Sequence, residues 1–302
     1  MHGFPTDLSD DNWAKRVERR ELRRLRRRRL LPWMGIPAVL AVLITAALLY
    51  HPHSNALNVN IPLTSAAPPA FQVDQARPFD NTPAANWASG AAGIVLPAAA
   101  PIGRYSAAQV ESAMTRAQQL IVLERLDPHV LETGDAEPVL ALLAPGQVAE
   151  LRPKLTPGNE SQNWWVTAKI APGFRLLPAA PRINGDMSPA LDKDGELTIK
   201  TNYIVAYAFS APDPSTVHDP MDIIVVARQE TEYTLIDDSG YDAASQGMWF
   251  GEINAFTYAG DCAWFRKGFL APSLGEAGVG LPVRPTEQYF DPTIPLPTEH
   301  DC

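Results

Sequence analysis

The sequence contains none of the short motifs that mark the best-known enzyme families. Its 302 residues include no G-x-S-x-G, H-E-x-x-H or S-x-x-K string and no glycine-rich loop of the kind that binds phosphate groups. These absences argue against serine hydrolases, zinc proteases, penicillin-binding enzymes and P-loop nucleotide-binding proteins. No reaction can therefore be assigned from a motif.

Histidine is also scarce, and only His129 and His218 of the six lie in the segment that we expect to fold. His218 forms a short string with Asp219 and Asp222, but a single imidazole in a loop is a poor basis for a metal site. We interpret this string as a solvated turn and His129 as a surface residue at the start of a helix. We expect no metal, no cofactor and no catalytic residue.

Charge is absent between residues 30 and 50. At about 1.5 Å per residue, a helix of these 21 residues covers the roughly 30 Å hydrocarbon core of a bilayer. We predict a single transmembrane helix here. A cleaved signal peptide is the alternative, although the apolar run is longer than is usual for one.

The flanking charges predict the orientation of this helix. Ten Lys and Arg residues lie within positions 15–29, and none follows the apolar run until Arg77. We expect the basic tail, residues 1–29, in the cytoplasm against anionic headgroups of the cell membrane, and the C-terminal domain to be extracellular. The tail carries ten basic and five acidic residues, or +5, and subtracting this from the chain's −9 leaves −14 outside. This acidic exterior argues against nucleic-acid binding.

The two cysteines, Cys262 and Cys302, both follow the predicted membrane span. An even pair on the oxidising side of a membrane is most simply a disulfide. The alternatives are a cross-link between two chains through Cys302, or two free thiols. A catalytic cysteine would need a histidine partner, and the sequence around these two residues suggests none.

Composition divides the exported part into three segments. Residues 51–104 are rich in Ala, Pro, Asn and Ser and predict an extended stalk, although the apolar stretch at 86–97 is expected to dock on the domain that follows. Residues 105–273 are long enough to bury a core and are predicted to fold. Residues 274–302 form a Pro-rich tail.

Helices precede strands in the predicted domain. Ser106 and Gln109 form a capping-box pattern before an apolar stripe that runs to Leu126, and short helices are expected after Asp127, after Asp135 and at 146–151. Strands are expected at 197–209, 223–236 and 249–264, with a bend at Gly251 or Gly260 and edge strands at 164–170 and 181–184. Two acidic segments, 192–196 and 237–240, are interpreted as turns with solvated carboxylates. This order predicts an α+β fold with a curved antiparallel sheet.

Three segments, 82–99, 197–209 and 261–273, resemble those of an actinobacterial family of single-pass membrane proteins whose function is not established. The order of the predicted elements also resembles the NTF2-like cone fold, in which a bent sheet wraps a long helix. This second resemblance implies a concave pocket between the first helix and the sheet. It names no activity, because such domains serve as enzymes, ligand binders and assembly modules.

An enzyme on this scaffold would need a general base on a strand. We expect Glu230 and Glu232 on a wet face and Tyr203 and Tyr207 in the core, and none of the candidates is assigned a catalytic role. The candidates are Tyr203, Tyr207, Glu230, Glu232, Tyr233 and Glu252.

The sequence favours a membrane-anchored extracytoplasmic module that binds or assembles without catalysis. Its partner would be an envelope protein or a small ligand. One alternative is a pocket enzyme, acting as a lyase, isomerase or hydrolase, and another is a structural component of a cell-envelope complex.

Overall fold

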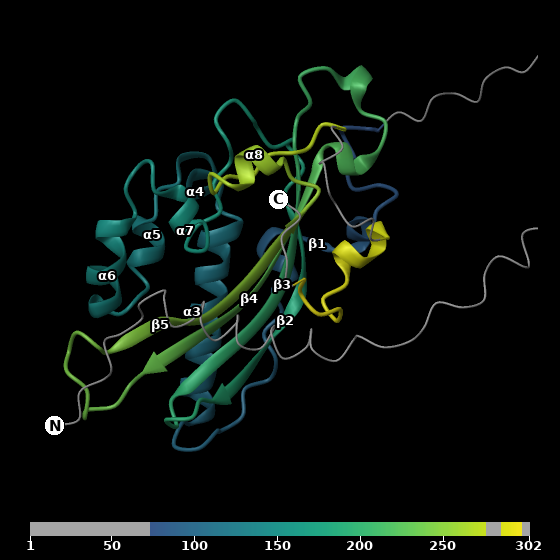
Figure 1. Ribbon diagram of the computed structural model, residues 1–302. Helices are drawn as coiled ribbons and strands as arrows, with labels where there is room; N and C mark the ends of the chain where they lie inside the picture. The colour runs from purple at the N-terminus through teal and green to yellow at the C-terminus, as the bar shows by residue number, and fades with distance from the viewer. Residues whose placement is uncertain (1–72, 276–284, 298–302) are drawn as a thin grey trace, which may run out of the picture. The chain divides into compact units, whose positions relative to one another are not determined.

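The computed structural model describes residues 73–275 and 285–297, which form an α+β fold (Figure 1). Its sheet has five strands that pair in chain order, each antiparallel to the one before it. The predicted membrane span at 30–50 lies outside the described residues, and none of the helices within them is both long and apolar enough to cross a membrane. The strands are β1 (Ala88–Ser89), β2 (Arg182–Leu191), β3 (Leu197–Ala208), β4 (Ile224–Ile236) and β5 (Gly247–Tyr258).

The longest helix, α3 (Ala107–Arg125), begins where the sequence predicts it. The Ser106 hydroxyl accepts a hydrogen bond from the Gln109 amide at 3.3 Å, and the Gln109 side chain accepts one from the Ser106 amide at 2.9 Å. Asp127 then caps α4 through the Val130 amide at 3.0 Å. The remaining α-helices are α4 (Pro128–Thr133), α5 (Glu137–Leu140), α6 (Pro145–Leu151), α7 (Glu160–Asn163) and α8 (Cys262–Phe265). The 3-10 helices are η1 (Pro83–Asn86), η2 (Gly90–Gly93), η3 (Arg152–Lys154), η4 (Pro214–Thr216), η5 (Pro220–Asp222) and η6 (Thr286–Phe290).

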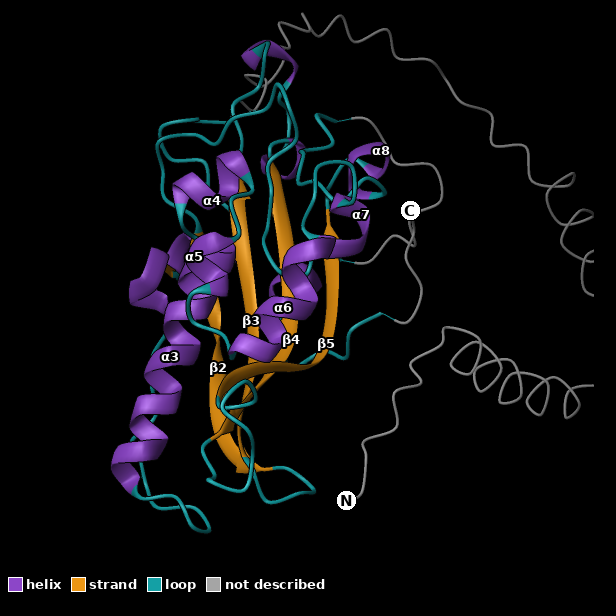
Figure 2. Cartoon of the chain, turned by 90° about the vertical axis from the view of Figure 1, so that its left-hand side faces the viewer, coloured by secondary structure: helices purple, strands orange, loops and turns teal. Residues whose placement is uncertain are grey.

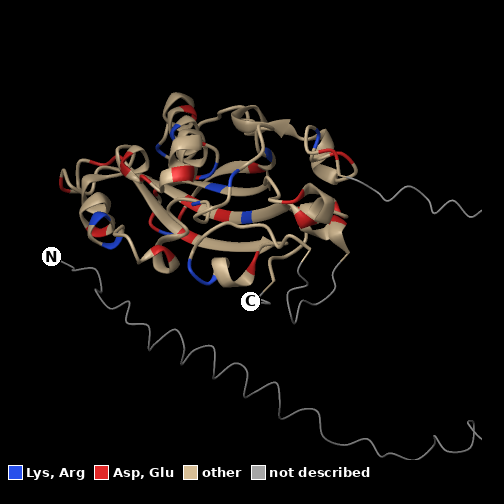
Figure 3. Ribbon diagram, turned by 90° about the horizontal axis from the view of Figure 1, so that it is seen from above, with Lys and Arg blue, Asp and Glu red and all other residues tan. Residues whose placement is uncertain are grey.

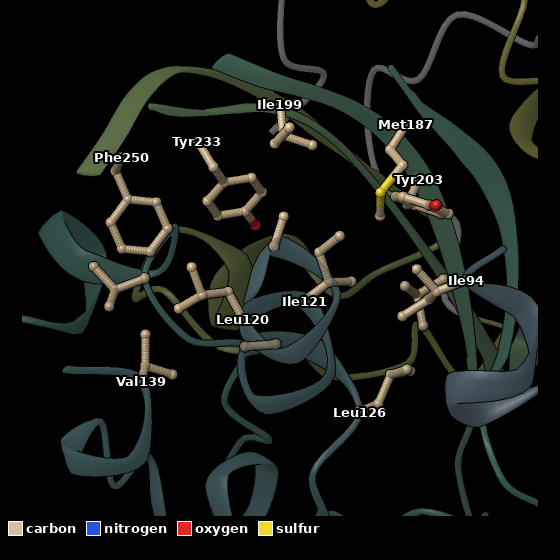
Figure 4. Packing of buried hydrophobic residues seen from close by; sticks show 14 of the residues in the cluster. Ile94, Leu120, Ile121, Leu126, Val139, Met187, Ile199, Tyr203, Tyr233 and Phe250 are labelled. Atoms are coloured by element: carbon tan, nitrogen blue, oxygen red, sulfur yellow. The ribbon is translucent and has the colours of Figure 1, made fainter. Parts of the chain in front are cut away.

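The sheet separates two hydrophobic clusters. We call the face that packs against α3 the inner face and the opposite one the outer face. Figure 2 shows α3 to α6 in front of one face of the sheet, and Figure 4 shows the sheet curving over α3. Side chains alternate along each strand, so residues such as Tyr203 and Val205 join the inner cluster while Ile204 and Ala206 join the outer one.

The sheet bends where the sequence predicts a bend at Gly251. The register between β4 and β5 shifts there, because two residues, Gly251 and Glu252, oppose the single residue Glu232. Such a bulge adds twist and bends the strand. The bend therefore contributes to the curvature of the sheet over α3.

Three predictions of strands need correction. The segment 164–170 forms only an isolated bridge, between Ile170 and Leu270. The strand predicted over 249–264 ends at Tyr258, because Asp261 caps α8 by accepting a hydrogen bond from the Trp264 amide at 2.9 Å. Conversely, the edge strand predicted at 181–184 extends to Leu191.

The segments predicted as stalk and tail cover the outer face within the described residues. Phe79 and Ala84 precede the predicted domain boundary, and Phe290 follows it, yet all three are buried in the outer cluster. Trp87 contacts Phe290 edge to face at 5.6 Å between ring centroids. The apolar stretch at 86–97 is docked, as predicted, since β1 pairs with β2 and Ile94 is buried. The folded unit thus extends beyond 105–273 at both ends.

Candidate functional site

A pocket lies between the C-terminal end of α3 and the inner face of the sheet. Two adjacent strands contribute small side chains to its lining, Ala227 of β4 and Ala255 of β5, which leave room below the helix. The cavity volume is about 50 Å³, which is room for a few water molecules or a small organic group. Apolar side chains form much of the remaining wall, among them Ile121, Trp164, Val205, Phe265, Phe269 and Leu270.

Glu124 is fully buried in the wall of this pocket. Its carboxylate accepts a hydrogen bond from the Tyr233 hydroxyl, which lies 3.2 and 3.1 Å from its two oxygens. Figure 4 shows Tyr233 pointing from the sheet towards α3. Burial raises the pKa of Glu124 to about 7, against the lowering effects of the neighbouring Arg125 charge and the Tyr233 hydrogen bond. The carboxyl group therefore changes its charge near neutral pH.

The next residue, Arg125, points its guanidinium into the same region. It donates hydrogen bonds to the carbonyl oxygens of Trp164, at 3.2 Å, and of Trp165, and to the side-chain oxygen of Gln229 in β4. The Tyr207 hydroxyl donates to the Arg125 carbonyl at 2.9 Å, which ties the end of the helix to β3. The Arg125 Nε atom is buried and has no hydrogen-bond partner among the described residues.

Tyr203 supplies a second buried donor to the pocket. It lies directly opposite Gln229 in the β3–β4 register, and the Gln229 side chain accepts a hydrogen bond from Arg125. Its side chain is 4% exposed, and its hydroxyl also has no hydrogen-bond partner among the described residues. Burial, followed by the charge of Asp186, raises the pKa of Tyr203 to about 12. The hydroxyl is therefore neutral and able to donate at physiological pH.

A close contact holds the Tyr203 ring over β2. Gly185 lies opposite Tyr203 in the β2–β3 register and has φ +152°, which side chains rarely adopt. A Cβ atom there would lie 2.7 Å from the ring and 2.0 Å from the Asn202 carbonyl oxygen. Glycine at this position therefore lets the tyrosine approach the backbone.

The structure separates the six candidate side chains by face. Tyr203, Tyr207 and Tyr233 all line the pocket, and burial raises the pKa of the Tyr207 and Tyr233 hydroxyls as well. The candidate glutamates are on strands but away from this pocket. Glu230 pairs with Arg228 at 2.7 Å, and Glu232 with Lys200 at 2.7 Å. Glu252 is exposed at the bulge.

Figure 3 shows acidic and basic residues beside one another on the sheet, in keeping with these ion pairs. The sequence-based expectation that Glu230 and Glu232 face water is partly met, since their side chains are 38% and 32% exposed. The tyrosines were expected to be core residues, and they are buried. What the sequence did not indicate is that their hydroxyls surround a pocket.

The loop residues singled out by the sequence are engaged in turns. Asp222 accepts hydrogen bonds from the amides of His218 and Asp219 at 2.8 and 2.9 Å, as the turn interpretation predicts. His129 is exposed at the start of α4, with Asp135 3.4 Å away. Within residues 73–275 and 285–297, no group of three His, Cys, Asp or Glu side chains is placed to hold a metal ion.

The two acidic turns join strands, as predicted, but their carboxylates are not all solvated. In the β2–β3 turn, Asp192 accepts hydrogen bonds from two backbone amides, and Glu196 is 4% exposed and accepts one from the Tyr105 hydroxyl at 2.5 Å. Arg104 bridges the two turns, since it contacts Glu196 at 2.5 Å and Asp238 at 2.8 Å. These contacts fasten the N-terminal end of α3 to the sheet.

Only one of the two cysteines of the predicted disulfide lies within the described residues. Cys262 is the first residue of α8, and Cys302 lies outside the described residues. The pairing therefore stays a prediction.

Glu124 and Arg125 are the site residues that the sequence reading missed. Glu124 lies seven residues after Ala117 and Arg125 four residues after Ile121, on the helix face that those apolar residues define. A charged pair on the apolar stripe of a helix is a detectable signal of a buried polar site.

Comparison with protein-family models, with curated proteins and with solved structures gave no match to this chain. Its function must therefore be argued from the pocket itself.

Proposed function

We propose that this chain is a membrane-anchored extracytoplasmic module that binds a small organic molecule in the pocket between α3 and the sheet. The observation that carries the proposal is the convergence of Glu124, Arg125 and Tyr203 on one cavity whose surface is otherwise largely apolar. Small-molecule sites combine such walls with a few placed polar groups. Burying a polar atom without a hydrogen-bond partner costs free energy, so the unpartnered atoms of Arg125 and Tyr203 call for an explanation.

The topology in this proposal comes from the sequence. The basic tail at 1–29 and the apolar run at 30–50 support a single span with the domain outside, and the order of helix and curved sheet supports an NTF2-like cone fold. A disulfide between Cys262 and Cys302 would fasten the C-terminal tail, and non-reducing mass spectrometry of natively exported protein tests it. Two free thiols would contradict it.

Thermal unfolding of the full-length protein in detergent tests the binding proposal. Fractions of the cell's small-molecule extract are added, and a ligand raises the melting temperature by mass action, with about 2.7 kcal/mol of stabilisation at a hundred times its Kd. Ala227→Leu fills the pocket and should abolish the increase. Ala190→Leu makes the same change in β2 outside the pocket lining and should retain it. An extract that stabilises no variant, or all three equally, contradicts the proposal.

A pocket enzyme is the second candidate, because the pKa of Glu124 lies near neutral pH. A carboxyl group with such a pKa can both accept and donate a proton at physiological pH. The compound that stabilises the protein is therefore incubated with it and analysed by mass spectrometry. Conversion by the wild type and not by Glu124→Gln would favour the enzyme, and unchanged recovery from both would favour the binding module.

A further inference from the structure

The two polar atoms without partners in the pocket have the same chemical character. Arg125 is 9% exposed and Tyr203 is 4% exposed, and both line the cavity. Among the described residues, neither Arg125 Nε nor the Tyr203 hydroxyl has a hydrogen-bond partner. Both can donate, and the arginine can only donate. A molecule that completes this site must therefore present an acceptor to each.

The nearby charges favour an acceptor that is negatively charged. The arginine carries a permanent positive charge, and its other contacts are to neutral oxygens, the carbonyls of Trp164 and Trp165 and the amide of Gln229. The other two cations of the pocket lining are already paired, Lys169 with Glu160 at 3.2 Å and Arg228 with Glu230 at 2.7 Å. Among the described residues Arg125 thus has no carboxylate in direct contact, and the carboxyl group of the adjacent Glu124, whose pKa burial raises to about 7, is only partly ionised near neutral pH.

The remaining walls limit what the negative group can be attached to. Apolar atoms make up most of the cavity surface, beside the hydroxyl-bearing Thr201, Thr231 and Thr257, so a highly polar molecule such as a sugar phosphate would leave many of its groups unpaired. A carboxylate with a short apolar body matches both the donors and the walls. An arginine and a tyrosine hydroxyl are suitable donors for its two oxygens.

We propose that the pocket binds a small carboxylate with an apolar body, whose oxygens accept hydrogen bonds from Arg125 Nε and the Tyr203 hydroxyl. This inference rests on the proposed function, since it names the class of ligand for the same pocket. It makes a definite distinction between an acid and its neutral or cationic analogues of equal size.

Calorimetric titration of the full-length protein in detergent with butyrate, butyramide and butylamine tests this distinction. Butyrate should bind at least tenfold more tightly than either analogue. Equal binding of butyrate and butyramide overturns the carboxylate class but leaves a small-molecule pocket in place. Tighter binding of butylamine overturns it as well. If none of the three binds, the inference fails because water alone satisfies the two donors, while the extract experiment still decides the proposed function.

Tyr203→Phe shows whether the hydroxyl contacts the ligand. It removes one donor that has no partner within the described protein, so it should weaken butyrate binding about fivefold without unfolding the protein. Tyr105→Phe is the matched control, because its buried hydroxyl bonds Glu196 and does not line the pocket. It should lower stability and leave butyrate binding unchanged. Equal affinity of wild type and Tyr203→Phe would overturn the assigned contact.

The pH dependence supplies a further readout. A neutral Glu124 should favour an anionic ligand, and with its pKa at about 7 the neutral fraction rises about tenfold from pH 8 to pH 6. Butyrate affinity should rise by about this factor in the wild type and stay flat in Glu124→Gln. A flat wild-type profile contradicts the inference. The other charged or titratable groups of this pocket lining are Arg125, Lys169, Tyr203, Tyr207, Arg228 and Tyr233.

Discussion

Arg125 and Arg228 are both more than nine-tenths buried, yet they differ in how completely they are bonded. Arg228 lies on the outer face and uses its three nitrogens, with bonds to Asn202, to Glu230 and to carbonyl oxygens of the segment 291–294. Arg125 lies on the inner face and keeps Nε without a partner among the described residues. Burial therefore does not distinguish the two arginines, whereas the completeness of their hydrogen bonding does.

The position of the two arginines shows how closely the two environments adjoin. Arg228 and Gln229, which binds Arg125, are consecutive residues of β4, and their side chains point to opposite faces because strand residues alternate. On the outer face the guanidinium fastens a segment of the chain. On the inner face the guanidinium of Arg125 lies beside the pocket.

The largest expected effect is the loss of the outer arginine. Arg228→Met leaves Glu230 and three carbonyl oxygens without their donor and should lower the free energy of unfolding by about 3 kcal/mol or more. Chemical denaturation of the full-length protein measures the loss, and hydrogen exchange should rise across residues 286–296. Lys200→Met is the control, because its outer-face ion pair with Glu232 is half exposed and should matter little. Unchanged exchange in Arg228→Met would refute its role as a fastener.

The next effect belongs to the inner face and depends on pH. The folded-state pKa of Glu124 is raised from 4.5 to about 7, so the native state favours the protonated carboxyl group. Its contribution to stability is fully present below the unfolded pKa and is lost as the pH rises to about 7. Between pH 4 and pH 8 the wild type should lose about 3 kcal/mol relative to Glu124→Gln. If the free energies of unfolding of the two proteins changed with pH in parallel, the pKa of Glu124 would not be raised in the folded state.

A smaller loss is expected when the donor to Glu124 is removed. Tyr233→Phe leaves the buried carboxyl group without its hydrogen bond and should cost about 2 kcal/mol above pH 7, where the group is charged. Below pH 5 the cost should be smaller. The same denaturation series at pH 5 and pH 8 measures both values. A loss that is independent of pH would mean that packing of the ring, and not the hydrogen bond, is responsible.

The smallest effect has the opposite sign. Tyr203→Phe removes a buried hydroxyl without a partner among the described residues, so the free energy of unfolding should stay equal or rise by up to about 1 kcal/mol. Tyr207→Phe removes a hydroxyl that bonds the Arg125 carbonyl and should instead lower it by about 1 kcal/mol. Denaturation at pH 7 compares the two. Destabilisation by both substitutions would show that the Tyr203 hydroxyl serves the fold.

Local patterns predicted the elements near them well. The capping box at Ser106 located the start of α3, and alternation of apolar residues located β3 and β4 to within one residue. The apolar residues of the segment 164–170 predict a strand. In the structure this segment forms part of the pocket wall and pairs only through an isolated bridge. Apolar residues in a short run cannot tell a strand from a buried loop, since both remove the same surface from water.

The order of helices and strands was sufficient to predict an α+β fold with an antiparallel sheet, because element type and pairing follow from the period of the apolar residues and from short turns. The site was not predictable in the same way. Glu124 and Arg125 meet Tyr203, Tyr207 and Tyr233 across about eighty to one hundred and ten positions of the chain. The position of Glu124 on the apolar stripe of α3 indicates burial, but the residues that surround its carboxyl group, and hence its raised pKa, follow from the packing of the sheet on the helix.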